Sequence, residues 1–171
     1  MPYRFRRRRR RVHPAVAAAA ATLTLAVLTH TPAATGTSTT TAAASGPAAT
    51  AIAYARAQLG KPYEWGGTGP DAYDCSGLVW AAYQSAGVDI PRTSQAQWAA
   101  LPHVPPADVR PGDLVFFPGS DGTFTAPGHV ALVIGGGQMI QAYAAGTPIE
   151  VSALNGDGAG GIVGYARPGG T

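Results

Sequence analysis

The chain contains a single cysteine, Cys75, among its 171 residues. One thiol has no partner within the chain, so a fold stabilised by internal disulfides is excluded. Only four histidines are present, and two of them, His13 and His30, lie in the N-terminal segment. The two remaining histidines and the cysteine are too far apart in sequence to suggest a ligand set, so we expect no metal and no cofactor.

The sequence also lacks an apolar run long enough to cross a membrane. The run from Ala15 to Leu28 has 14 residues, whereas a membrane-spanning helix needs about 20. It follows a block of arginines and precedes small and polar residues, an order typical of a secretory signal. We therefore predict a signal peptide over residues 1–34, with cleavage there or as late as about residue 44, and a secreted protein without a stable membrane anchor.

Residues 35–50 consist mainly of threonine, alanine, serine, glycine and proline, with almost nothing able to pack in a core. This composition predicts a flexible lead-in. Residues 51–168 are then long enough for one folded domain of ordinary size. The sequence shows no internal repeat and no second domain, and we expect a monomer.

Positive charge is scarce beyond the N-terminal segment. Seven of the twelve basic residues precede residue 12 and all nine acidic residues follow it, which leaves five basic residues and a net charge of −4 for the remainder. Nucleic-acid binding depends on a basic surface. The sequence therefore gives no support to a nucleic-acid partner, and we expect none.

Helices are predicted before strands along the folded part. Capping residues and helical spacing predict a helix that begins after Thr50, a second that begins near Asp74, and a short third that is capped by Thr93 or Ser94. Alternating apolar residues then predict strands within residues 113–117, 128–134, 138–144, 149–154 and 162–168, with a three-glycine hairpin loop at residues 135–137. This order predicts an α+β domain with an antiparallel sheet.

Cys75 lies at the predicted start of the second helix. If Asp74 is the N-cap, Cys75 occupies the first turn, where unpaired N–H groups and the helix dipole favour an anion. Such a position is expected to lower the pKa of a thiol and to increase its reactive thiolate fraction. The alternative is a small buried residue without a chemical role. The neighbours Ser76 and Gly77 are not typical core residues, which favours a reactive thiol.

The two histidines outside the predicted signal peptide are candidates for the base that would deprotonate the thiol. His103 lies in a proline-rich loop and is expected to be solvated. His129 begins a strand, and with the predicted hairpin loop Ala131 pairs with Gln141, which places Gln141 diagonal to His129 on one face. The amide oxygen of Gln141 could then accept the imidazole N–H and fix its tautomer, as the amide does in a Cys-His-Asn site. Each residue alone could equally be an ordinary polar residue of a strand.

Four segments resemble the NlpC/P60 family of secreted cell-wall cysteine peptidases, in order and over nearly all of residues 51–167: "GKPYEWGG", "DAYDCSGLVWAAYQSAG", "RPGDLVFF" and "PGHVALVIGGGQMIQA". The resemblance implies a papain-like α+β fold, with the nucleophile at the start of a helix packed on an antiparallel sheet. It implies that Cys75 is the nucleophile, His129 the base and later the acid, and Gln141 the orienting residue. Gln141 is a departure, because the family usually has histidine there, and this lowers the expected rate rather than changing the reaction class.

The resemblance also implies residues around this centre. Tyr63 matches the tyrosine that, together with the backbone N–H of Cys75, stabilises the tetrahedral oxyanion. Asp74, Ser76 and Ser94 match positions that contact substrate in some members, Asp74 through a substrate amine. Local roles are the alternative: Asp74 and Ser94 as helix caps, and Tyr63 as packing in a loop.

The substrate class implied by the resemblance is the stem peptide of peptidoglycan. The implied reaction is hydrolysis of the amide between γ-D-glutamate and the diamino acid, through a thioester on the enzyme. Two alternatives keep the same site but change the bond or the acceptor: a muramoyl–alanine amidase and an acyl transferase. A third alternative is a catalytically silent module that only binds the cell wall.

Overall fold

The computed structural model describes residues 44, 46–155 and 160–170. The predicted signal peptide and most of the predicted lead-in lie outside the described residues. Helices precede strands as predicted, so the α+β fold class is confirmed. The elements, in chain order, are α1 (Pro47–Ala57), α2 (Cys75–Ser85), α3 (Ser94–Ala100), β1 (His103–Val104), the 3₁₀ helix η1 (Pro106–Asp108), β2 (Leu114–Phe117), β3 (His129–Gly135), β4 (Gln138–Gln141), β5 (Glu150–Ala153) and β6 (Gly164–Ala166).

Helix α1 begins earlier than the sequence suggested. Its N-cap is Gly46 and Pro47 lies in its first turn, where the missing N–H costs no hydrogen bond and the fixed φ suits a helix. The prediction that Thr50 caps this helix is therefore wrong, and the last residues assigned to the lead-in are helical. Ala51 and Ala55 are fully buried, so α1 packs closely on the rest of the fold.

The caps of α2 and α3 agree with the sequence analysis. Asp74 caps α2 and accepts a bond from the backbone N–H of Gly77, while Thr93 caps α3 through the N–H of Ala96. Gly87 follows α2 with φ 73°, a left-handed conformation that glycine adopts without strain and that ends a helix. The nucleophile candidate is thus the first residue of a capped helix.

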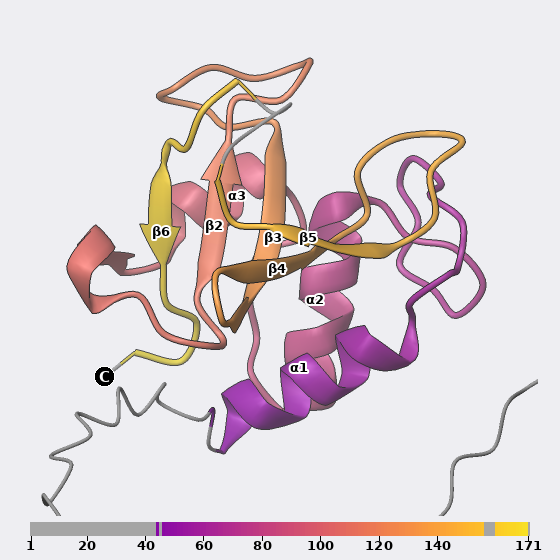
Figure 1. Cartoon of the computed structure of the whole chain (residues 1–171), viewed down its shortest axis with the longest axis horizontal. Coiled ribbons are helices and arrows are strands. Elements are labelled where there is room, and N and C mark those ends of the chain that lie inside the picture. Colours follow the sequence, from indigo (N-terminus) through magenta and orange to yellow (C-terminus); the bar gives the residue numbers. More distant parts are fainter. Residues whose placement is uncertain (1–43, 45, 156–159, 171) are drawn as a thin grey trace, which may run out of the picture. The chain divides into compact units, whose positions relative to one another are not determined.

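The six strands form one sheet in the order β1-β6-β2-β3-β4-β5, with antiparallel neighbours throughout. Alternation along the central strands divides the core in two. Leu114, Phe116, Val130 and Leu132 pack with α1 and α2 on one face, while Val115, Phe117, Ala131 and Val133 pack on the other. Figure 1 shows α1 next to α2 and α2 next to β3. Helix α3 contacts β2 through the rings of Trp98 and Phe116, whose centroids lie 5.2 Å apart.

The proline-rich segment after α3 contains a short strand that the sequence analysis assigned to a loop. His103 and Val104 pair with Ala166 and Tyr165 of β6. The exposed His103 ring stacks on Trp98 at a centroid distance of 3.7 Å, and its Nε2 lies 2.9 Å from Trp98 O. A two-residue strand has too few residues to produce an alternating pattern, so nothing in the sequence indicated it.

The β3–β4 hairpin has a shorter loop than predicted. Leu132 pairs with Ile140, but the register shifts near the turn so that Gly135 pairs with Gln138. The loop is therefore the two residues Gly136 and Gly137, at φ 63° and 69°, and the three-residue loop was wrong by one residue. The shift affects only the turn, because the Leu132–Ile140 register is the one that the predicted position of Gln141 requires.

Candidate active site

The thiol of Cys75 lies against the first residues of β3. Cys75 is 9% exposed, and its Sγ donates to Gly128 O at 3.8 Å. The backbone N–H of Val130 also faces the sulfur. Gly128 and Val130 are the two residues on either side of His129, so the packing of α2 on β3 brings the sulfur to the main chain that carries His129.

Burial sets the proton affinity of this thiol. Loss of solvent raises the pKa of Cys75 above its ordinary value, and the nearby Asp74 carboxylate raises it further. Hydrogen bonds from Val130 N–H and from Ser76 lower the pKa but do not outweigh burial. The backbone N–H of Ser76, in the first turn of α2, acts in the predicted direction, but the predicted net lowering of the pKa is wrong, because burial of this turn against β3 outweighs it. The thiol is protonated at neutral pH.

The imidazole of His129 is held by Gln141. His129 Nε2 lies 2.9 Å from Gln141 Oε1, as the diagonal placement on neighbouring strands predicted. His129 is 4% exposed, and its ring contacts two aromatic rings, Phe117 at 5.7 Å and Tyr143 edge-on at 5.4 Å between centroids. Burial lowers the pKa of His129, and the bond to Gln141 only partly opposes this. The imidazole is therefore neutral at neutral pH.

The protonated nitrogen of His129 follows from the partners of Gln141. The amide Nε2 of Gln141 lies 2.9 Å from Ser152 Oγ and 3.5 Å from Glu150 Oε1. An ionised carboxylate only accepts hydrogen bonds, so the NH₂ of Gln141 faces β5 and its oxygen faces His129. The imidazole Nε2 must donate to that oxygen, which leaves the lone pair on Nδ1. A neutral imidazole with this free nitrogen can act as a general base.

The carboxylate of Asp74 has several partners within the chain. Its Oδ1 accepts from Gly77 N at 2.6 Å, from Arg92 at 3.0 Å and from Ser76 Oγ at 3.2 Å. Its Oδ2 accepts from Arg92 at 2.7 Å and from Gly66 N at 2.9 Å. Arg92 also donates to Ser76 Oγ at 2.9 Å. This network joins the start of α2 to the loop after α1.

Ser94 lies close to this network in sequence but has a different setting. It is the first residue of α3 and 4% exposed, and its Oγ donates to Gln95 Oε1 at 3.2 Å. The N-cap role that the sequence offered to Thr93 or Ser94 belongs to Thr93.

The loop that carries Tyr63 packs directly on α2. A Cβ at Gly77 would lie 2.0 Å from Gly67 O, so only glycine permits this close approach. Burial raises the pKa of the Tyr63 hydroxyl, and the nearby Cys75, Asp74 and Asp121 raise it further. Tyr63 is thus within electrostatic range of the thiol, and its hydroxyl stays protonated and able to donate a hydrogen bond.

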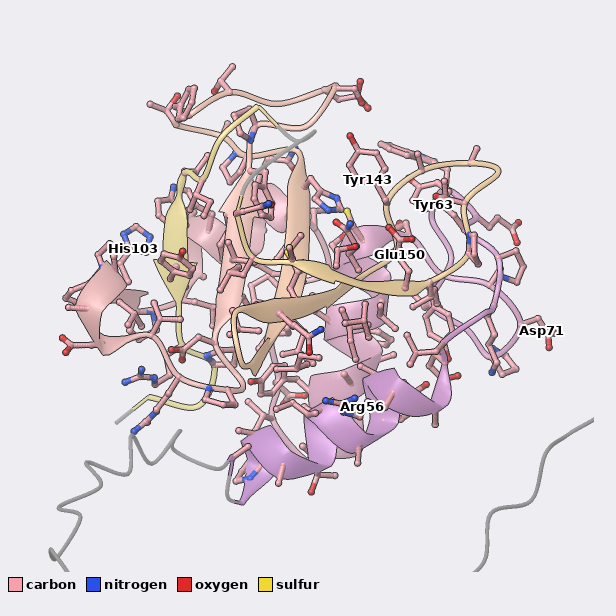
Figure 2. All side chains as sticks on the ribbon, in the orientation of Figure 1. Arg56, Tyr63, Asp71, His103, Tyr143 and Glu150 are labelled. Carbon is pink, nitrogen blue, oxygen red and sulfur yellow. The ribbon has the colours of Figure 1, made fainter. Side chains whose placement is uncertain are left out.

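Four residues around the site were not anticipated: Arg92, Tyr143, Glu150 and Ser152. The only indication for Arg92 in the sequence was that few basic residues lie outside the predicted signal peptide. Glu150 pairs with Gln141 across β4 and β5, and Ser152 is two residues further on, so the strand register would have identified both. In Figure 2, Tyr143 and Glu150 lie in the same region as Tyr63, whereas His103 lies at the other side, on the opposite edge strand.

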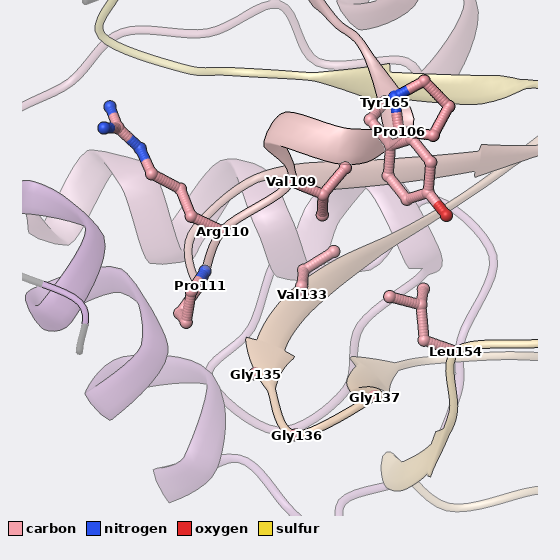
Figure 3. A pocket seen from close by; sticks show the side chains of 10 residues that line it. All are labelled: Pro106, Val109, Arg110, Pro111, Val133, Gly135, Gly136, Gly137, Leu154 and Tyr165. Carbon is pink, nitrogen blue, oxygen red and sulfur yellow. The ribbon is translucent and has the colours of Figure 1, made fainter. Parts of the chain in front are cut away.

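A hollow of about 330 Å³ lies between residues 106–111 and the β3–β4 turn (Figure 3). Val133, Leu154 and Tyr165 complete its wall, on the sheet face away from α1 and α2. None of the predicted site residues lines it, so it is separate from the site at Cys75. Within the described ranges, no three histidine, cysteine or acidic side chains are grouped to hold a metal ion, and no helix is long and apolar enough to cross a membrane.

A model of the NlpC/P60 family matches residues 60–161, a stretch that includes every predicted site residue. The chain belongs to the NlpC/P60 family. Its papain-like α+β fold is that of solved NlpC/P60 structures. NlpC1 from Trichomonas vaginalis superposes with a TM-score of 0.65 at 27% identity, over 74% of this chain and 45% of that one. The peptidoglycan hydrolase RipB from Mycobacterium tuberculosis superposes with a TM-score of 0.59 at 35% identity, over 71% and 64%.

Two further relatives have higher sequence identity to this chain. "Probable endopeptidase p60" of Listeria monocytogenes is 40% identical over 114 residues, 66% of this chain and 22% of the relative. A probable endopeptidase of Corynebacterium glutamicum is 43% identical over 101 residues, 59% of this chain and 46% of the relative. The chain thus spans about a fifth to about a half of the length of these relatives.

Proposed function

We propose that this NlpC/P60 protein is a secreted cysteine peptidase that hydrolyses peptidoglycan stem peptides at the bond between γ-D-glutamate and the diamino acid. The observation that carries the proposal is the 2.9 Å bond between His129 Nε2 and Gln141 Oε1, on the strand against which the Cys75 thiol packs. The relatives named as endopeptidases and as a peptidoglycan hydrolase support the substrate class. Peptidoglycan lies outside the cytoplasm, in agreement with the predicted signal peptide.

The first half-reaction forms a thioester. Because thiol and imidazole are both neutral at rest, His129 Nδ1 takes the proton from Cys75 as the sulfur attacks the scissile carbonyl carbon. The carbonyl oxygen becomes an oxyanion, which the protonated Tyr63 hydroxyl and the Cys75 N–H stabilise. His129 then returns the proton to the departing nitrogen, the C–N bond breaks, and the amine half of the peptide leaves.

The second half-reaction uses the same groups with water. His129 Nδ1 accepts a proton from a water molecule, whose oxygen attacks the thioester carbon. The C–S bond breaks, the proton passes to the sulfur, and the γ-D-glutamyl half leaves as a carboxylic acid. Asp74 and Ser76 at the start of α2 and Ser94 at the start of α3 are the proposed substrate contacts, Asp74 through a substrate amine.

The test is digestion of purified sacculi and defined muropeptides by the full chain, with products identified by mass. Cys75→Ala should reduce fragment release by at least about 10³-fold, because the nucleophile is lost. Circular dichroism of the variant checks that it folds. Iodoacetamide should block the wild-type protein by alkylating Cys75 alone.

The masses of the products distinguish the proposed peptidase from the alternative functions. Fragments ending in γ-D-glutamate support the proposal, whereas cleavage at the muramoyl–alanine bond or transfer to a second peptide would replace it with the amidase or the transferase. Binding to sacculi without hydrolysis by the wild-type protein would favour a silent module. Undiminished release by Cys75→Ala would overturn the cysteine mechanism.

A further inference from the structure

The side chain of Gln141 is held from β5 by two residues. Gln141 pairs with Glu150 across the β4–β5 ladder. Its Nε2 lies 2.9 Å from Ser152 Oγ and 3.5 Å from Glu150 Oε1, and Ser152 Oγ lies 3.0 Å from the same carboxylate oxygen. The three side chains form a closed triangle of hydrogen bonds, and one corner of it is the amide that holds His129.

The direction of every bond in this triangle follows from Glu150. Its carboxylate only accepts, so the Ser152 hydroxyl donates to it and keeps its lone pairs for the Gln141 NH₂. A reversed amide would place its oxygen beside the carboxylate oxygen and would offer its NH₂ to His129. The triangle therefore favours one of the two amide orientations.

We propose that Glu150 and Ser152 are positioning residues, which fix the amide of Gln141 so that His129 keeps its proton on Nε2 and its lone pair on Nδ1. This inference rests on the proposed function, in which Nδ1 accepts the proton of Cys75. With the reversed amide, His129 Nε2 would become the acceptor and Nδ1 would carry the proton, so Nδ1 could not serve as the base.

The orientation of the residue 141 side chain must be fixed because this residue is an amide. A carboxylate at this position would present an acceptor to the imidazole in either orientation. The amide of Gln141 has one accepting and one donating end, and a 180° rotation exchanges them. The acceptor that selects the correct end comes from β5, an edge strand on which Glu150 is exposed.

The test combines a spectroscopic measurement on the resting protein with kinetics. Two-bond ¹H–¹⁵N spectra of the full chain with labelled histidine report the tautomer of His129, whose signals are those missing from His129→Gln. Glu150→Gln keeps the size of the side chain but removes its strict acceptor character. We expect a pure Nε2–H tautomer in the wild type, a mixture in Glu150→Gln, and a fall in kcat of about tenfold with KM within about twofold.

Two further variants separate this role from a structural one. Ser152→Ala removes the central hydroxyl and should also give a mixed tautomer and a lower kcat. Val151→Thr is the matched control: Val151 lies between the two residues on β5, its side chain points to the other face, and the β-branched shape is kept. We expect neither the tautomer nor kcat to change in Val151→Thr.

The outcomes of the two measurements are distinguishable. An unchanged tautomer and kcat in both Glu150→Gln and Ser152→Ala would overturn the positioning role, while hydrolysis by the wild type would still support the proposed function. A shifted tautomer in Glu150→Gln and Ser152→Ala, with no muropeptide cleavage by the wild type, would support the positioning of the Gln141 amide by Glu150 and Ser152. The same result would contradict the proposed function. If Glu150→Gln does not fold, Ser152→Ala decides the question.

Discussion

Among the residues that the structure describes, Arg167–Asp113 and Arg92–Asp74 are ion pairs with similar geometry in different surroundings. Arg167 Nε lies 2.7 Å from Asp113 Oδ1, and Arg92 lies 2.7 Å from Asp74 Oδ2. The side chain of Asp113 is 1% exposed and that of Arg167 is 20% exposed, against 10% for Asp74 and 32% for Arg92. The first pair is therefore the more deeply buried of the two.

Their neighbours give the two pairs different roles. Asp113 also accepts from Arg110 N at 2.8 Å and connects the start of β2 to the residue that follows β6. Asp74 joins the loop after α1 to the first turn of α2 and adds a negative charge beside Cys75. Burial therefore decides how much stability is lost when one partner of a pair is removed, while the adjacent residues decide whether the pair affects chemistry.

Breaking the buried pair should have the largest effect on stability. Arg167→Met leaves the Asp113 carboxylate buried without its ionic partner, so we expect the free energy of unfolding to fall by about 3–5 kcal/mol. Urea denaturation measures the change. The control is Asp89→Asn, which alters an exposed aspartate bonded to Gln84 at 2.8 Å and should change stability by less than about 0.5 kcal/mol.

The activity of the folded fraction shows whether the Asp113–Arg167 pair affects catalysis as well as stability. Below the unfolding transition, Arg167→Met should keep the wild-type kcat, because neither partner of this pair contacts the site residues. A stability loss under about 1 kcal/mol, or a large loss of kcat in the folded protein, would show that the pair has been assigned the wrong role.

Asp74→Asn should have a smaller effect on stability and a clear effect on the thiol. Asparagine is also a good N-cap, and Arg92 is about a third exposed, so we expect a loss of about 1–2 kcal/mol. The Asp74 charge raises the pKa of Cys75, and a negative charge disfavours the thiolate. Its removal must therefore lower this pKa, and alkylation by iodoacetamide should begin at a lower pH than in the wild type.

The rate of alkylation against pH measures this shift. Asp89→Asn loses the same charge at an exposed position and should leave the profile unchanged. A profile that does not move in Asp74→Asn, or that moves to higher pH, contradicts the electrostatic role of Asp74.

The sequence predicted those parts of the fold that depend on local signals. The start of α2 at Asp74 was predictable because N-capping is a property of a short segment. The contact between His129 and Gln141 was predictable because strand alternation and hairpin register set it within thirteen residues. The start of α1 was misjudged because Pro47 suits a first turn even within a segment of low complexity.

The parts that escaped prediction depend on contacts between distant segments. The pKa of Cys75 depends on how deeply α2 packs against β3, which no local pattern reports. Arg92 reaches Asp74 from 18 residues away, and Glu150 meets Gln141 only because β5 pairs with β4. Residue type alone did not distinguish these side chains from ordinary surface charges.

The most direct measurement is rapid acid quenching of the full chain with a defined γ-D-glutamyl–diamino acid muropeptide, followed by peptide mapping by mass. We expect a thioester adduct on the peptide that contains Cys75, with the mass of the γ-D-glutamyl half, and no adduct in Cys75→Ala. Cleavage of the muropeptide with no adduct on Cys75, at an equal rate in Cys75→Ala, would contradict it.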